Sequence, residues 1–355
     1  MSTQHQPLAS PRRLLASVSL AIGALLLSAG FRATAGGGTA RPQKVTLEPF
    51  FQEHRVTVAV TDSGLGGLSV VAEAVRKMKE ARIFERAEFV FFNALFSNEG
   101  GYNSLRRREE KIRVFSSALE SLEEKCHPDV ILIGCNTLSA IYEETPFSQK
   151  TKIPVIPIIQ AGVELIARGL EDHPAASVII FGTPTTISEG TYPRELERLG
   201  FAPERIYGQS CPELESFIEN DPRGDETEML ISGFLSEALQ KLPSPPPPLL
   251  VSLNCTHYGY SLPFWEKAFP EAGVKPLAVL NPNPRMAEVL FSPKYRGRHP
   301  QTEVRVRIVS MVEISRRKID SLAAWLERVS PETAEALRRY EYRPSLFEWK
   351  KYITH

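Results

Sequence analysis

Two stretches of this 355-residue chain decide its fold: VILIGCNT at residues 130–137 and LLVSLNCTH at residues 249–257. In each stretch a mainly apolar run leads to a cysteine that is followed by small polar residues. Uncharged apolar runs of this length are typical of strands buried on both faces of a parallel sheet. In open α/β sheets, ligands bind at the carboxyl ends of the strands. The pattern therefore predicts two strands that deliver Cys135 and Cys255 to a binding edge.

Around these two strands the chain repeats one plan. A strand at 56–61 ends in the turn DSGLGG (62–67), and a strand at 177–181 ends in the turn GTPTT (182–186). Each turn precedes its cysteine by nearly the same distance along the chain. Glycines permit a tight turn, and the helix start that follows offers free N–H groups to an anion. We predict an α/β fold of two similar parallel-sheet, flavodoxin-like domains that face a central cleft.

The predicted boundaries follow from this repetition. Domain A is expected at 53–158 plus about 278–312, domain B at 159–277, and a helical C-terminal extension at 313–355. Apolar residues at helical spacing and a Ser-Pro helix start at 330–331 indicate helices in the extension. A tail packed on the first domain is preferred to an element that binds a partner or a membrane surface.

The first 35 residues have the composition of a targeting segment. Arg12 and Arg13 precede an uncharged apolar run from 14 to 31, and Ala33-Thr34-Ala35 offers a small-residue cleavage motif. This order is typical of a secretory signal peptide, and an uncleaved signal anchor is the alternative. We therefore expect an exported protein, periplasmic or anchored to the membrane by this N-terminal segment.

The charge balance excludes one large class of partners. Lys plus Arg and Asp plus Glu each number 42, and no basic face is interleaved with aromatic residues, so we expect a small-molecule partner and no nucleic acid. The chain has four cysteines: Cys126, Cys135, Cys211 and Cys255. Two disulfides are an alternative in an exported protein, but a chain of this size does not need them, and free thiols are favoured at Cys135 and Cys255. No Cys/His spacing supports a metal site.

Two thiols presented in equivalent ways suit a reaction with two equivalent faces. Racemisation at a carbon beside a carboxylate is such a reaction, because one group removes a proton and another returns it from the opposite side. Hydroxyl groups on Ser63, Thr137 and Thr256 are suitable donors to the substrate carboxylate. The helix starts that follow the strands are expected to favour the thiolate form of each cysteine.

Six motifs in order make the chain similar to a known family. They cover about residues 55–290 and read DSGLGG (62–67), CNT (135–137), IPVI (153–156), GTPTT (182–186), CP (211–212) with Glu219 downstream, and CTHY (255–258). In these motifs the chain resembles glutamate racemase, of the cofactor-independent Asp/Glu racemase group.

The resemblance implies a set of roles. Cys135 and Cys255 would be the acid/base pair, assisted by Asp62, His257 and Glu219. The substrate-binding residues implied are Asp62, Ser63, Tyr102, Asn136, Thr137, Thr183, Thr186, Thr256 and His257. The reaction implied is interconversion of L- and D-glutamate without PLP, any other cofactor or a metal. D-glutamate of this origin serves peptidoglycan synthesis in the cell wall, a role suited to the cytoplasm rather than to an exported enzyme.

The chain departs from the family pattern near Tyr102. The segment reads Gly101-Tyr102-Asn103, and the proline and glycine that flank the family's tyrosine are absent. We expect the loop 93–103 to set how deep a substrate side chain reaches. Glutamate is the expected substrate, with aspartate or a related acidic amino acid as the alternative. A non-catalytic exported binding protein for an acidic ligand is the second class considered, and a homodimer is left open.

Overall fold

The computed structural model describes residues 46–353. The predicted signal segment at 1–35 lies outside the described residues, so export and anchoring stay predictions. Among the described helices, none is long and apolar enough to cross a membrane.

Within residues 46–353, ten strands form two sheets, and every neighbouring pair runs parallel. The first sheet has the order β10 (Glu341–Tyr342), β9 (Glu303–Ser310), β2 (Arg86–Asn93), β1 (Arg55–Asp62), β3 (Val130–Ile133) and β4 (Val155–Pro157). The second sheet has the order β6 (Ile206–Ser210), β5 (Ser177–Gly182), β7 (Leu249–Asn254) and β8 (Ala278–Leu280). Two parallel sheets with helices confirm the predicted fold class.

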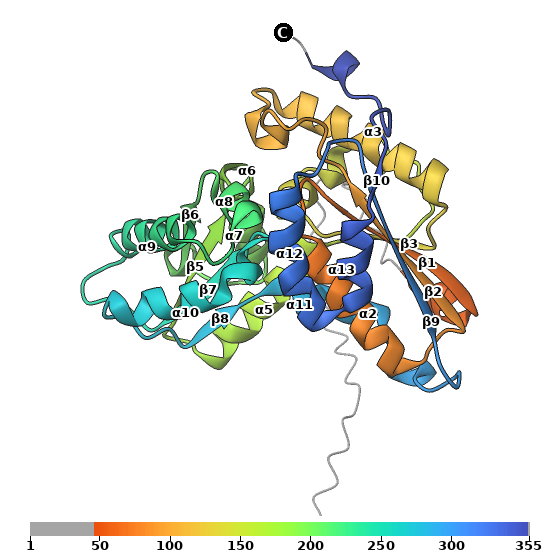
Figure 1. The fold of residues 1–355 in the computed structure, drawn as a ribbon. Helices are drawn as coiled ribbons and strands as arrows, with labels where there is room; N and C mark the ends of the chain where they lie inside the picture. The colour runs from red at the N-terminus through yellow and green to blue at the C-terminus, as the bar shows by residue number, and fades with distance from the viewer. Residues whose placement is uncertain (1–45, 354–355) are drawn as a thin grey trace, which may run out of the picture. The chain divides into compact units, whose positions relative to one another are not determined.

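Helices connect the strands, as parallel pairing requires (Figure 1). The α-helices are α1 (Glu48–Gln52), α2 (Leu68–Ala81), α3 (Arg108–Cys126), α4 (Asn136–Ser139), α5 (Ile158–Asp172), α6 (Pro184–Ser188), α7 (Thr191–Arg198), α8 (Leu214–Asn220), α9 (Asp225–Leu239), α10 (Leu262–Glu271), α11 (Pro282–Ala287), α12 (Arg316–Val329) and α13 (Pro331–Arg338). Short 3₁₀ turns are η1 (Gly101–Ser104), η2 (Tyr142–Glu144), η3 (Pro203–Arg205), η4 (Tyr258–Ser261), η5 (Glu288–Leu290), η6 (Pro293–Tyr295) and η7 (Lys350–Tyr352).

The first sheet is covered on both faces, which is why its central strands β1 and β3 lack a polar side. Val58 of β1 packs in one core with α2 and the C-terminal helices, whereas its neighbour Ala59 faces a second core with α3. All four residues of β3 are buried. An apolar run with no alternation is therefore the correct signal for these strands.

The C-terminal segment is mainly helical, as predicted, and adds one strand that was not. Ser315 and Ser330 accept main-chain N–H groups at the starts of α12 and α13, and Pro331 occupies the first position of α13. After α13 the chain forms β10, which extends the first sheet beside β9. Figure 1 shows α12 and α13 side by side near α2. Helix α12 contacts both α2 and α8, so the tail joins the two halves.

Two local differences from the predicted elements affect boundaries. Residues 278–280 form β8, which pairs with β7 in the second sheet, so the return to the first sheet comes after this strand rather than at 278. The IPVI motif at 153–156 only partly coincides with β4, which covers Val155–Pro157 and leads directly into α5 at Ile158. Neither difference moves a cysteine strand.

Candidate active site

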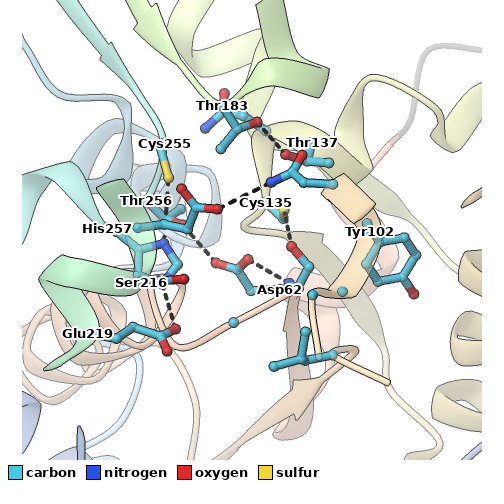
Figure 2. Close-up of a pocket in the computed structure, with 18 of the residues that line it drawn as sticks. Asp62, Tyr102, Cys135, Thr137, Thr183, Ser216, Glu219, Cys255, Thr256 and His257 are labelled. Atoms are coloured by element: carbon cyan, nitrogen blue, oxygen red, sulfur yellow. Dashed lines mark hydrogen bonds and ion pairs between the residues drawn. The ribbon is translucent and has the colours of Figure 1, made fainter. Parts of the chain in front are cut away.

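A small cavity of about 110 Å³ lies where β1, β3, β5 and β7 end. Its lining includes both Cys135 and Cys255, which come from corresponding strand ends in the two halves (Figure 2). Of the residues predicted from the sequence, Thr186 alone is outside the cavity lining, and it stands behind Thr183. The structure therefore gathers the predicted residues at one place.

The Cys135 thiol is connected to the second half of the protein through Ser63 and the Asp62 carboxylate. Cys135 Sγ lies 3.1 Å from the hydroxyl oxygen of Ser63. The Ser63 main-chain N–H donates to Asp62 Oδ1 at 2.6 Å, and the Thr256 hydroxyl donates to Asp62 Oδ2 at 2.7 Å. Both Asp62 oxygens are thus engaged, and the buried carboxylate links the turn after β1 to the turn after β7.

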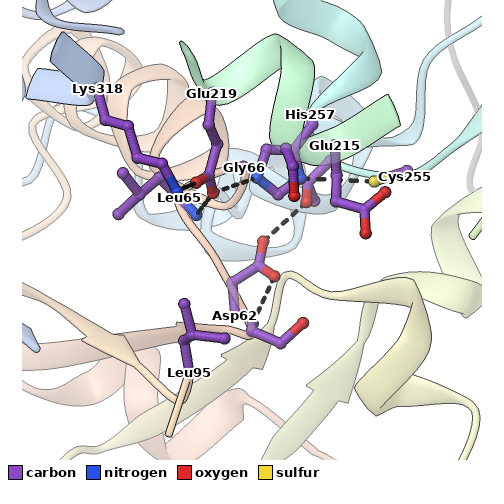
Figure 3. A network of polar contacts seen from close by, with 12 residues as sticks. Asp62, Leu65, Gly66, Leu95, Glu215, Glu219, Cys255, His257 and Lys318 are labelled. Carbon is purple, nitrogen blue, oxygen red and sulfur yellow. Dashed lines mark hydrogen bonds and ion pairs between the residues drawn. The ribbon is translucent and has the colours of Figure 1, made fainter. Parts of the chain in front are cut away.

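The second thiol begins a chain of polar contacts that ends outside the second half. Cys255 Sγ is 3.5 Å from His257 Nδ1, and His257 Nε2 is 2.8 Å from Glu219 Oε1. The same oxygen accepts the Leu65 main-chain N–H at 2.7 Å, while Lys318 Nζ donates to Glu219 Oε2 at 2.7 Å. Figure 3 shows this row of Cys255, His257, Glu219 and Lys318. Lys318 belongs to α12, in the C-terminal extension.

The glycine turn after β1 is required by its closeness to His257. A Cβ added to Gly66 would lie 2.6 Å from His257 Nδ1 and 2.8 Å from the His257 main-chain nitrogen. One added to Gly64 would lie 2.8 Å from Glu219 Oε1. Residues with side chains would push the two halves apart at this point, so the glycines serve close approach.

Hydroxyl groups from both halves meet at one end of the cavity. The Thr137 and Thr183 hydroxyl oxygens are 2.8 Å apart, and Thr183 and Thr186 are 3.0 Å apart. Thr183 also caps α6, since its side chain accepts the Thr186 main-chain N–H. Asn136 accepts a hydrogen bond from Tyr192 at 2.6 Å, and its Nδ2 is buried with no partner among the described residues. These groups are neutral donors suited to a carboxylate.

The thiols are protonated in the ligand-free cavity. Burial raises the pKa of Cys135, and the nearby Asp62 carboxylate adds to the rise. Burial likewise raises the pKa of Cys255 well above its usual value, with Glu215 as the next contributor. The expectation that helix starts favour the thiolates is therefore wrong for this state. The helix after Cys135 has only four residues, and desolvation beside carboxylates outweighs it.

The groups beside the thiols are shifted in different directions. Burial raises the pKa of Asp62. Burial acts the same way on Glu219, but the His257 hydrogen bond and charge, together with Lys318, outweigh it and lower the pKa of Glu219 to about 2. Burial alone would lower the pKa of His257, yet its pKa is raised because Glu219 and further carboxylates face it. Glu219 is therefore ionised and favours a charged imidazole.

Tyr102 lines the cavity, but its ring is part of the core. It packs edge-to-face against Phe96 and Phe115, with ring centroids 5.2 and 6.3 Å apart. In Figure 2 the ring of Tyr102 extends away from the two cysteines. The structure thus places Tyr102 at the site's edge, and its contact with a substrate stays a prediction.

The sequence analysis assigned no site role to several cavity residues, among them Asn103, Glu215, Ser216 and Lys318. Glu215 lies one helical turn before Glu219 in α8, so the four-residue spacing of these two acids was an available signal. The sequence held no such signal for Lys318, because it lies 99 residues beyond its partner Glu219. All four cysteines are free, and no group of three His, Cys, Asp or Glu side chains suited to a metal occurs within residues 46–353.

Comparison with known proteins agrees with this geometry. The family model for Asp/Glu/hydantoin racemase matches residues 66–243, which is half of the chain. Among curated proteins, the glutamate racemase of Syntrophus aciditrophicus is 30% identical over 202 residues, which cover 57% of this chain and 67% of that protein. The glutamate racemase of Aquifex pyrophilus is 26% identical over 202 residues, covering 57% of this chain and 70% of the relative.

Solved structures show the same fold. The glutamate racemase of Francisella tularensis, solved with D-glutamate, matches with a TM-score of 0.58 at 22% identity and covers 78% of this chain and 95% of its own. A glutamate racemase isoform from Bacillus anthracis matches with a TM-score of 0.59 at 20% identity, covering 82% and 99%. The family-model match over half of the chain and the 30% identity to the Syntrophus aciditrophicus enzyme place the protein in the Asp/Glu/hydantoin racemase family, as an isomerase of the racemase type.

Proposed function

We propose that this protein interconverts the L and D forms of an α-amino acid by a two-cysteine proton transfer that needs no PLP. The observation that carries the proposal is that Cys135 and Cys255 line one cavity from corresponding strand ends. Each thiol also has its own polar partner, Ser63 for Cys135 and His257 for Cys255. A protein that only binds an acidic ligand needs neither thiol, so this arrangement favours catalysis.

The proposed chemistry conserves atoms and electrons. The thiolate of one cysteine takes the α-proton, so the Cα–H bond breaks, an S–H bond forms, and the electron pair spreads into the substrate carboxylate. The S–H bond of the other cysteine then breaks and its proton is delivered to the opposite face. Asn136 Nδ2 and the hydroxyls of Thr137 and Thr183 are placed to stabilise the carboxylate charge.

The raised thiol pKa values fit this scheme. A thiolate formed in this cavity is a stronger base than an ordinary one, which narrows the gap to the weakly acidic α-carbon. The thiol must first lose its proton. The Asp62 carboxylate beside Cys135 can accept one, and His257 in its neutral form can accept that of Cys255, with Glu219 favouring the charged imidazole that results. A substrate α-ammonium brought beside Asp62 would also favour ionisation of a nearby thiol.

Glutamate is the reference substrate, because the named relatives are glutamate racemases. Aspartate and related acidic amino acids are the alternatives predicted from the sequence. The hydroxyl end of the cavity suits an α-carboxylate of any amino acid. The cavity is also lined by Glu215 and Asn103, whose acceptor oxygens are less suited to a second carboxylate.

We also propose that the protein is exported, on the strength of its first 35 residues. In an oxidising compartment, activity would require both thiols to be kept reduced. Cell fractionation followed by N-terminal sequencing of the mature protein tests export, cleavage and anchoring together. Recovery of uncleaved protein in the cytoplasm would overturn this part.

The reaction itself is tested with the full-length chain under reducing conditions and without PLP. Each L-amino acid is incubated in D₂O, with α-proton exchange followed by NMR and optical inversion followed by circular dichroism. We expect inversion with the native protein, loss of inversion with Cys135→Ala or Cys255→Ala, and unchanged inversion with Cys126→Ala, whose thiol does not line the cavity. Exchange of no amino acid by the folded, reduced protein would refute the proposal.

A further inference from the structure

We propose that Glu215 and Asn103 select a substrate side chain that bears N–H donors, an ammonium or an amide, rather than a free carboxylate. This inference rests on the proposed racemase function and concerns the same cavity. It departs from the glutamate expected from the sequence.

Two buried acceptor atoms lie together without a donor. Asn103 Nδ2 donates to Glu215 Oε1 at 3.3 Å, which fixes the orientation of the amide. The other two oxygens, Asn103 Oδ1 and Glu215 Oε2, are buried and have no hydrogen-bond partner among the described residues. In Figure 3 the Glu215 carboxylate lies near Cys255. Buried acceptors are costly when unsatisfied, so a ligand with donors is favoured here.

The cations of the cavity are already neutralised. Among the described residues that line it, the basic side chains are His257 and Lys318, and both are paired with Glu219. Asp62 and Glu215 add two further carboxylates without a cation of their own. Burial raises the pKa of Glu215, so the ionised carboxylate is disfavoured here unless a positive charge lies beside it. A second substrate carboxylate would meet repulsion at this end.

The rest of an amino acid has other partners. The threonine hydroxyls and Asn136 Nδ2 are donors for the α-carboxylate, and Asp62 is an acceptor for the α-ammonium. With the α-carbon between the two thiols, the side chain is left to Glu215 and Asn103. Asn103 ends the loop 93–103, so the segment that departs from the family pattern is the one that holds Glu215. The altered loop 93–103 and Glu215 are thus in direct contact in the cavity.

The test compares side chains in one assay with the full-length, reduced protein. L-ornithine, L-lysine, L-glutamine, L-glutamate and L-aspartate are incubated in D₂O, and kcat/KM for α-proton exchange is measured by NMR. We expect at least one of ornithine, lysine and glutamine to exceed both acidic amino acids by about tenfold or more. Comparison of ornithine and lysine with glutamine shows whether an ammonium or a neutral amide is the favoured side-chain group.

Two variants assign the preference to Glu215. Glu215→Gln keeps the size of the side chain and removes its charge, so exchange of ornithine and lysine should fall by about tenfold or more relative to glutamine and glutamate. Glu213→Gln is the matched control, because Glu213 is exposed, precedes α8 and does not line the cavity. It should leave the order of substrates unchanged.

The outcomes separate the two proposals. Glutamate as the best substrate, with no loss of its exchange in Glu215→Gln, would overturn the inference while leaving the racemase function intact; Lys318 would then be the group that receives the side-chain carboxylate. If Glu215→Gln leaves the order of substrates unchanged, the inference about Glu215 is also overturned. Solvent water, and not the substrate side chain, would then satisfy the two acceptor oxygens. No exchange of any amino acid would overturn both proposals.

Discussion

At the scale of single residues, the two thiols are equivalent in position but not in surroundings. Cys135 has a serine hydroxyl beside it, and that serine is tied to Asp62. Cys255 faces an imidazole that is held by Glu219. Proton release from the two thiols therefore follows different routes, and the two single-cysteine variants need not behave alike.

The first prediction separates the duties of the two thiols. Cys135→Ala and Cys255→Ala should each lower racemisation by about 10²- to 10⁴-fold, the usual contribution of a general acid or base. Each variant should still remove a proton from one enantiomer of an amino acid that carries a good leaving group on its β-carbon, because elimination needs only one base. Circular dichroism measures racemisation, and release of the leaving group measures elimination. Full racemase activity in Cys135→Ala would contradict the two-thiol mechanism.

At the scale of elements, α12 completes a site that the two sheets begin. Helix α12 lies outside the part of the chain that matches the family model, yet Lys318 from it contacts Glu219. The charged nitrogen lowers the pKa of Glu219, which in turn holds His257 beside Cys255. Lys318 is therefore a positioning residue that acts on the second thiol through two others.

The second prediction tests α12 through Lys318→Met. Loss of the cation raises the pKa of Glu219, so the acidic limb of the kcat/KM profile should move to higher pH. The value of kcat should fall about tenfold, less than the ~10²-fold or more expected for a group that transfers the proton itself, because Lys318 acts through Glu219 and His257. Lys318→Arg should restore much of both. Arg316→Met is the control, since Arg316 is exposed on the same helix and pairs only with Asp320. A profile of the same shape in Lys318→Met would show that the lysine is merely structural.

The third prediction concerns the turn after β1. In Gly66→Ala the new methyl group would overlap the His257 main chain, so kcat should fall and the free energy of unfolding should decrease. Gly233→Ala is the matched change in α9, where a Cβ meets nothing within 4 Å. It should instead stabilise the protein by about 0.5–1 kcal/mol, the usual helix advantage of alanine. Urea unfolding measures the stability of both variants. A Gly66→Ala variant with unchanged stability would contradict the close approach of Gly66 to His257.

At the scale of the whole molecule, the cavity couples folding to pH. Glu219 has a pKa near 2 in the folded protein against 4.5 as its ordinary value. A depressed carboxyl pKa stabilises the fold above the ordinary value, and that contribution disappears as the pH falls toward the folded value. Glu215 has a raised pKa, so its ionised form opposes folding at neutral pH and its protonation removes the penalty.

The fourth prediction uses these opposite signs. Glu219→Gln should be less stable than the native protein at pH 7, by an amount on the order of 3 kcal/mol, and the difference should shrink between about pH 4.5 and 2. Glu215→Gln should be more stable than the native protein at pH 7, with the advantage fading on acidification. Urea unfolding over this pH range measures both differences. Equal pH dependence in the two variants would show that neither carboxyl has the stated surroundings.

How much could be predicted from the sequence depends on the range of the signal. The βα repeats, the turn at 62–67 and the two strand-end cysteines are local patterns, so their elements were predicted to within a few residues. Residues 278–280 pair with β7 in the second sheet, which the sequence could not indicate because a three-residue strand has no periodicity to distinguish its neighbours. Strand β10 was not predicted for the same reason, since two residues carry no periodic pattern.

By itself, the sequence determined the two parallel-sheet halves and the residue types at their strand ends, because uninterrupted apolar runs and glycine turns act within a few residues. The tertiary structure decided which charges meet in the cavity. Glu219 and Lys318 lie 99 residues apart, and Asn103 and Glu215 lie 112 apart, so only chain packing brings either pair into contact. The protonation of the thiols likewise follows from desolvation, which depends on the closed cavity rather than on neighbouring residues in the chain.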